Sequence, residues 1–285
     1  MVQQKEEGYY FLVNLFPNKD SKSKRLPDEI TVIWDVSLSG LHRNIPLELE
    51  LLGAYLKKTK KILVSLVAFN NQARKLREYF IQNGNWNELK KDIERFTYDG
   101  GTSFENIIYP ASEEYLLFTD GISSFNNTNF PFPDKPVYTI TSSPRSDFSQ
   151  LQYISQKTSG RFINLNTLQT EEAVKLLIEQ PLQIINIRKS NATEEVYPSV
   201  PFPIINNCSL AGFTRDAFAD ITIVLGYGSS VQSEKRIVLN ASRHTVTNIN
   251  IERIWAQKKI AELDIQYDKN KNTIEQLGKK YGIVT

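Results

Sequence analysis

The sequence predicts an α/β protein with a doubly wound, mostly parallel sheet, followed by a smaller β-rich unit with two C-terminal helices. The segment 30–34, which reads ITVIW, is apolar toward both faces, as is typical of a central strand covered by helices on each side. Strand-like and helix-like segments then alternate as far as Pro181, the pattern of a parallel sheet connected by helices. After Pro181 short alternating strands follow, so a second unit is expected there.

The strands of the first part are runs of β-branched, aromatic and other apolar residues bounded by turns. A turn rich in lysine and serine, at 17–27, separates the first run from ITVIW, and residues 73–81 are compatible with either a strand or a helix. The expected strands are, in chain order, 9–16, 30–34, 62–69, 114–119, 137–140 and 161–165. Ligands of such sheets bind beyond the carboxyl ends of the strands, so the loops that follow these segments are where a site is expected.

The helices of the first part are marked by capping residues and by apolar residues on one side. Pro46 lies where a proline fits the first turn of a helix. Asp147 and Thr170 are expected to cap the helices that follow them, and Pro181 ends the last one. The expected helices are 46–58, 86–96, 147–158 and 170–179.

The second part has the period of a small β unit. Its expected strands are 183–188, 221–227 and 236–239, and the prolines of the loop 196–203 disfavour a helix there. Two helices, 250–267 and 271–280, are expected to pack back as a brace, with Trp255 anchoring the first to the core. The predicted domains are therefore 8–181 and 182–285.

Composition and charge exclude several functional classes. The net charge of +2, from 34 basic and 32 acidic residues, provides no global attraction for nucleic acid or anionic lipid. The single cysteine excludes an intrachain disulfide, and two histidines argue against a closed zinc site. No segment approaches the ~18 to 20 apolar residues of a membrane span, so membrane insertion is not expected of this chain.

Three loops offer hard oxygen donors. Asp35, Ser37 and Ser39 come after ITVIW at alternating positions, Thr102 follows two glycines, and Asp120 follows the strand 114–119. Two aspartates meeting in one crevice would repel by roughly 4 kcal/mol at 4 Å and an effective dielectric constant near 20. A divalent cation removes that repulsion, and a donor set of oxygens alone suits Mg²⁺, or Mn²⁺ or Ca²⁺, better than zinc or copper.

These five residues match, in order, the metal-ion-dependent adhesion site of the von Willebrand factor type A family, which the chain resembles over about residues 8–181. The resemblance implies that the two serines and the threonine bind the metal directly, and the aspartates directly or through water. Leu38 and Gly40 depart from the family pattern DxSGSM, which has glycine and methionine there, so the shape of this loop is in question.

The wider arrangement resembles inter-alpha-trypsin inhibitor heavy chains and their bacterial relatives, in which a VIT domain precedes such a module. The features that carry this resemblance are the strand 9–16, Glu195-Val196-Tyr197-Pro198, Arg253-Ile254-Trp255-Ala256 and the ending 281–285, which reads as a strand cut short. No VIT domain is present in this sequence, which is expected to be a piece of a longer protein.

The function implied is that of a non-enzymatic adhesion module. The open coordination position of the cation would accept an Asp or Glu carboxylate of a partner protein, and the loops 42–44, 70–72, Asp99 and 122–125 would supply specificity. The family resemblance favours a location outside the cytoplasm.

Two alternatives remain. The first is a structural module of a cell-envelope or secreted assembly with a vestigial metal site. The second is a Mg²⁺-dependent hydrolase, because an aspartate at a strand end also describes haloacid-dehalogenase-like phosphatases. Those enzymes need a second aspartate two residues further on, where this chain has Ser37, and the sequence has no GxSxG, P-loop lysine or Cys/His pair.

Overall fold

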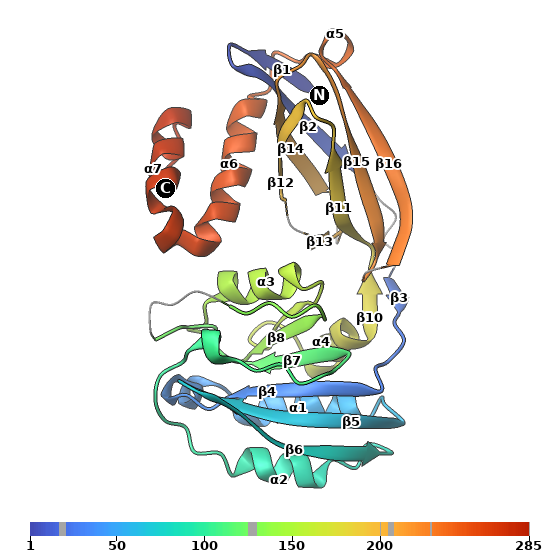
Figure 1. The fold of residues 1–285 in the computed structure, drawn as a ribbon, viewed down its shortest axis with the longest axis vertical. Coiled ribbons are helices and arrows are strands. Elements are labelled where there is room, and N and C mark those ends of the chain that lie inside the picture. Colours follow the sequence, from blue (N-terminus) through green and yellow to red (C-terminus); the bar gives the residue numbers. More distant parts are fainter. Residues whose placement is uncertain (17–20, 125–129, 200, 205–207, 229, 285) are drawn as a thin grey trace. The chain divides into compact units, whose positions relative to one another are not determined.

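The computed structural model describes residues 1–16, 21–124, 130–199, 201–204, 208–228 and 230–284. The chain folds into two compact units (Figure 1). One runs from Ser23 to Glu179, and the other combines Met1–Lys22 with Gln180–Thr285. The chain crosses between them in two short strands, β3 (Ser21–Ser23) and β10 (Glu179–Pro181), which pair with each other.

The unit Ser23–Glu179 is built on a six-stranded sheet. Its strands, in spatial order, are β6 (Ala73–Gln82), β5 (Lys61–Phe69), β4 (Glu29–Asp35), β7 (Glu114–Phe118), β8 (Val137–Thr141) and β9 (Phe162–Asn164). All neighbours are parallel except β6, the edge strand, which is antiparallel to β5. The predicted doubly wound sheet is therefore confirmed, and the ambiguous segment 73–81 is a strand.

Helices cover both faces of this sheet. They are α1 (Ile45–Leu56), α2 (Asn87–Glu94), α3 (Phe148–Lys157) and α4 (Thr170–Ile178), with short 3₁₀ turns at η1 (Leu38–His42) and η2 (Phe104–Asn106). The strand β4 shows why both faces need cover. Trp34 packs in one apolar core with residues of α1 and α4, while its neighbour Ile33 belongs to a second core that includes Ile154 of α3.

The cap of α4 differs from the prediction. The N-cap is Gln169, whose backbone N–H donates to the Glu172 carboxylate. Thr170 is the first helical residue, and its hydroxyl donates to Glu50 of α1 instead. The predicted cap Asp147 of α3 is confirmed, because its side chain accepts from the N–H of Gln150.

The other unit contains two four-stranded antiparallel sheets that share an apolar core. The first sheet has the order β1 (Val2–Lys5), β2 (Gly8–Leu15), β14 (Cys208–Thr214), β12 (Thr193–Tyr197). The second has the order β13 (Phe202–Pro203), β11 (Gln183–Lys189), β15 (Phe218–Tyr227), β16 (Ser230–Asn240). The remaining elements are α5 (Ala241–His244), α6 (Ile251–Leu263), η3 (Asp264–Gln266) and α7 (Tyr267–Tyr281).

The predicted domain boundary at residue 8 is wrong. The strand β2 pairs along its length with β14, so residues 8–15 belong to the β-rich unit and not to the doubly wound one. Its alternating side chains explain the placement. Phe11 and Val13 face the core between the two sheets, while Tyr10 and Leu12 pack against α6 on the outer face of the sheet. The predicted boundary between residues 181 and 182 lies close to the observed change of unit after Glu179.

The prediction of a strand at the end of the chain is also wrong. Tyr281 is the last residue of α7, and residues 282–284 form no strand, while Thr285 lies outside the described residues. The strands β12 and β14 were not expected from the sequence. The two predicted helices, 250–267 and 271–280, correspond to α6 and α7, but the break between them lies at η3 and not at 268–270. Among the described residues, no helix has the length and apolar character needed to cross a membrane.

Candidate metal centre

The strands β4 and β7 are adjacent and parallel. In the strand order the chain continues from β4 to β5 in one direction and from β7 to β8 in the other. This makes the carboxyl ends of β4 and β7 the switch point of the sheet, where ligands of α/β proteins bind. Asp35 is the last residue of β4, and Thr119 and Asp120 follow β7 directly. The topology therefore brings the two aspartate-bearing loops to one place.

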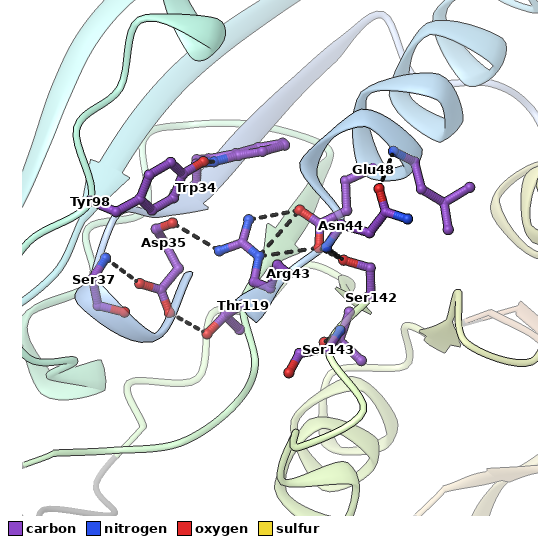
Figure 2. Close-up of polar contacts among 12 residues, drawn as sticks. Trp34, Asp35, Ser37, Arg43, Asn44, Glu48, Tyr98, Thr119, Ser142 and Ser143 are labelled. Atoms are coloured by element: carbon purple, nitrogen blue, oxygen red, sulfur yellow. Dashed lines mark hydrogen bonds and ion pairs between the residues drawn. The ribbon is translucent and has the colours of Figure 1, made fainter. Parts of the chain in front are cut away.

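The Asp35 carboxylate is completely buried and makes two short contacts (Figure 2). Its Oδ1 accepts from the backbone N–H of Ser37 at 2.8 Å, and its Oδ2 accepts from the Thr119 hydroxyl at 2.6 Å. Burial raises the pKa of this carboxyl, an effect that the charge of Arg43 and the hydrogen bonds from Ser37 and Thr119 oppose only in part. A cation bound beside Asp35 would favour its charged form.

The two serines lie together in the turn that follows β4. Their hydroxyl oxygens are 3.0 Å apart, and Ser37 is buried while Ser39 is partly exposed. Leu38, which stands at the family's glycine position, donates its N–H to the carbonyl of Gly100 at 2.9 Å and leaves its side chain 56% exposed. The leucine therefore does not fill the space around the serine hydroxyls.

Gly40 is required by a neighbouring ring. A Cβ atom at this position would lie 2.6 Å from Cδ1 of Tyr98, whose hydroxyl accepts a hydrogen bond from the Trp34 indole at 3.0 Å. A larger residue here would have to displace Tyr98. This explains in physical terms why the chain has glycine where the family pattern has methionine.

Thr102 follows a tight glycine turn and is bonded to the loop after β7. Gly100, with φ of +73°, makes the turn before it, and the backbone N–H and carbonyl of Thr102 bond to Ser124 in the loop after β7. The side chain is 1% exposed. Among the described residues, its hydroxyl finds no hydrogen-bond partner, although a buried hydroxyl normally has one.

Asp120 is also buried, with an exposed fraction of 2%. One carboxylate oxygen accepts from the N–H of Ile122 at 3.0 Å, and the backbone carbonyl accepts from Asp147 at 2.8 Å. Gly121, with φ of +79°, permits the sharp turn between Asp120 and Ile122.

The structure links the three loops that carry the predicted ligands. Leu38 bonds to Gly100, Thr102 bonds to Ser124, and Asp35 bonds to Thr119. Asp99 forms the turn before Gly100 by accepting that residue's N–H, as a turn-forming aspartate does, and His42 is exposed. Of the specificity loops predicted from the sequence, only Phe125 lies outside the described residues.

Two residues of this centre were missed from the sequence. Arg43 and Glu48 have fully buried side chains. The guanidinium donates to the Glu48 carboxylate and to the backbone carbonyl of Asp35 (Figure 2). Burial lowers the pKa of Arg43, but the Glu48 carboxylate more than offsets this, so the pKa is raised. The sequence analysis placed Arg43 in the loop 42–44 and Glu48 in the expected helix 46–58, and a spacing of five residues does not by itself distinguish a buried pair from an exposed one.

The donor set suits a hard cation. It consists of two carboxylates and three hydroxyls, and one of those hydroxyls, that of Thr102, is buried without a partner in the described structure. Among the described residues, no group of three or more His, Cys, Asp or Glu side chains is arranged to hold a metal ion.

Comparisons with known proteins give similarities of fold. No protein-family model matches the chain, and no curated protein matches it. It is similar to the ArnB paralog VWA2 from Sulfolobus acidocaldarius, with 15% identity over 95% of this chain and 82% of that one, and a TM-score of 0.47. It is similar to a von Willebrand factor type A protein from Catenulispora acidiphila, with 11% identity over 98% and 92%, and a TM-score of 0.49. A third similar structure is proximal thread matrix protein 1 from the mussel byssus with a zinc-occupied MIDAS motif, with 18% identity over 60% and 49%, and a TM-score of 0.35.

The features of the chain itself name the fold. Its sheet has the order β6-β5-β4-β7-β8-β9 with one antiparallel edge strand, and helices cover both faces. Asp35, Ser37, Ser39, Thr102 and Asp120 lie in the loops at the switch point, in the order that the sequence motif requires. The unit Ser23–Glu179 therefore has the doubly wound α/β fold that the resemblance to von Willebrand factor type A domains implies.

Proposed function

We propose that the unit Ser23–Glu179 is a non-enzymatic protein-binding module that holds a divalent cation. The ligands would be Asp35, Ser37, Ser39, Thr102 and Asp120, and the cation Mg²⁺, with Mn²⁺ or Ca²⁺ as alternatives. The observation that carries the proposal is the buried Thr102 hydroxyl, which has no hydrogen-bond partner among the described residues. A buried polar atom left unpaired costs about 1–3 kcal/mol, and a metal ion would supply the missing interaction.

The charge of the site supports the same proposal. Asp35 and Asp120 are both buried, and the hydrogen bonds of the buried Arg43 guanidinium go to the backbone carbonyl of Asp35 and to the Glu48 carboxylate. When bound, the cation would supply an open coordination position for a hard anionic oxygen from outside.

The partner is proposed to be a protein that presents an Asp or Glu side chain. Leu38, Leu41 and Ile122 are 56%, 63% and 42% exposed on the loops that carry Ser37, Ser39 and Asp120. Such side chains can add apolar contact area around a carboxylate held by the cation. The partner's acidic residue would then have apolar neighbours. The proposal includes a location outside the cytoplasm and a relationship to inter-alpha-trypsin inhibitor heavy chains.

The metal is tested by calorimetric titration of Mg²⁺ into the wild type and into Asp120→Ala. The wild type is expected to bind one equivalent, and the variant to lose measurable binding because one of two carboxylate ligands is gone. Asp28→Ala, which removes an exposed carboxylate paired with Arg25, is the control and should bind like the wild type. Equal heats in wild type and Asp120→Ala would contradict the proposed site.

The partner chemistry is tested with immobilised protein and a library of random peptides that share one fixed central glutamate. Retention is expected with Mg²⁺, release with EDTA, and no retention when glutamine replaces the fixed glutamate. Equal retention of the two libraries would exclude carboxylate recognition. Metal binding without retention of either library would favour a structural module instead.

A further inference from the structure

Arg43 lies at the centre of a buried polar network that joins three elements of the unit Ser23–Glu179. Its Nη1 donates to the backbone carbonyl of Asp35 at 2.8 Å, at the end of β4. Its Nε and Nη2 donate to the two carboxylate oxygens of Glu48, in the first turn of α1, with a shortest distance of 2.7 Å. Both side chains are 0% exposed. Figure 2 shows that the guanidinium stands between Asp35 and Glu48.

The network continues from Glu48 to the end of β8. The Ser142 hydroxyl donates to Glu48 at 2.7 Å and accepts from the N–H of Asn44 at 2.6 Å, and the Asn44 side chain caps α1. Glu48 is therefore held on both sides, by Arg43 and by Ser142. A rigidly held carboxylate fixes the direction of the guanidinium fork, whose geometry allows it to bond two acceptors at once.

The contact with Asp35 acts on the turn that carries the metal ligands. Fixing the Asp35 carbonyl fixes the peptide plane that leads into Val36 and Ser37, and the N–H of Ser37 donates to the Asp35 side chain. The next N–H, that of Leu38, donates to Gly100 in the loop of Thr102. Glu48 has a second effect, because it balances the positive charge of Arg43, which would otherwise repel a cation at the proposed site.

We propose that Arg43 is a positioning residue that holds the turn from Asp35 to Ser39 in its metal-binding conformation before the metal arrives, and that Glu48 orients Arg43 and neutralises its charge. The positioning can be measured without metal, whereas its effect on metal affinity rests on the proposed function. A purely structural role would contribute to the free energy of unfolding and leave the turn unchanged.

The test uses the double variant Arg43→Met/Glu48→Leu, which removes both charges at once and so leaves no unpaired buried ion. Without added metal, in EDTA, the amide hydrogens of Ser37 and Leu38 are expected to exchange faster than in the wild type. With Mg²⁺, the Kd is expected to rise about 10- to 100-fold, the usual effect of removing a group that orients a metal ligand.

The matched control is the double variant Lys24→Met/Glu114→Leu. This second buried pair joins Lys24 Nζ to Glu114 at 2.6 Å. Glu114 lies at the amino end of β7, whereas Asp35 lies at the carboxyl end of the neighbouring parallel strand β4. The control should change neither the exchange of Ser37 and Leu38 nor the Kd for Mg²⁺. It separates a general loss of buried ion pairs from a local effect on the turn.

Unchanged exchange at Ser37 and Leu38 in the Arg43→Met/Glu48→Leu variant would overturn the inference, whether or not the wild type binds Mg²⁺. Faster exchange together with a wild type that binds no Mg²⁺ would support the positioning and contradict the proposed function. If the double variant does not fold, Arg43→Lys replaces it. Lysine keeps the charge but has no fork with which to bond Glu48 and Asp35 together, so faster exchange is expected there too, and wild-type exchange would again overturn the inference.

Discussion

Replacing Asp35 with asparagine is expected to stabilise the metal-free protein and to abolish the proposed binding of Mg²⁺. The side chain is completely buried, and burial raises the pKa of its carboxyl, so the ionised form costs free energy in the absence of a cation. Asparagine keeps an acceptor for the Ser37 N–H and can donate to the Thr119 hydroxyl. The expected gain at pH 7 in EDTA is on the order of 1 kcal/mol in the free energy of unfolding.

The sign of the pH dependence follows from the raised pKa. The folded state binds the Asp35 proton more tightly than the unfolded chain, in which an aspartate has a pKa of about 3.9. The stability contributed by this proton is fully present below that value and is lost as the pH rises through the folded pKa. Other buried acids, such as Glu114, act in the same direction, so the difference between wild type and variant isolates Asp35.

Urea unfolding from pH 4 to pH 8 in EDTA measures this difference. The free energy of unfolding of Asp35→Asn should exceed that of the wild type increasingly as the pH rises, and Mg²⁺ should stabilise only the wild type. A variant that is less stable than the wild type at pH 7 in EDTA would show that the carboxylate is already compensated within the protein.

Replacing Trp255 with alanine is expected to cost about 3–5 kcal/mol, the usual price of deleting a buried indole. Trp255 is 6% exposed on α6, and its ring lies 5.2 Å from Tyr10 of β2 and 5.8 Å from Tyr281 at the end of α7. Nearby, Lys259 places its ammonium 5.0 Å from the centre of the ring. The substitution would leave a cavity between the helices and the sheet of the β-rich unit.

Trp255→Phe is the matched control for this prediction. The indole N–H of Trp255 is buried with no hydrogen-bond partner among the described residues, so phenylalanine removes no hydrogen bond seen there and keeps a ring against Tyr10. Its cost should be less than half that of alanine. Urea unfolding followed by circular dichroism compares the two, and a loss below about 1 kcal/mol for alanine would show that α6 is not anchored through this ring.

Much of the doubly wound unit could be predicted because its signals are local. The apolar run of β4 identifies a strand buried on both faces, and the period of two along an extended chain groups Asp35, Ser37 and Ser39. The starts of α1 and α3 follow from Pro46, in the first turn of its helix, and from Asp147, next to its helix. Four of the five proposed ligands were identified from their order and from the strand end before them, and Thr102 from its order and the two glycines before it.

What could not be predicted depends on contacts between distant parts of the chain. The strand β2 looks the same in sequence whether it pairs with β4 or with β14, and only the pairing of Leu12 with Ala211 assigns it to the β-rich unit. Arg43 follows an exposed histidine, so nothing local distinguishes it from a surface cation. Its burial becomes visible only when the ends of β4 and β8 meet the start of α1.

The most direct test of the metal centre is an anomalous diffraction map from crystals of the protein grown with Mn²⁺. The account predicts one strong peak among the side chains of Ser37, Ser39 and Thr102, about 2.0–2.3 Å from their hydroxyl oxygens, with Asp35 and Asp120 as direct ligands or one water further away. The same crystals of Asp120→Ala should lose the peak. A Mn²⁺ ion bound elsewhere, or none at a saturating concentration with the Thr102 hydroxyl still unpaired, would contradict the account.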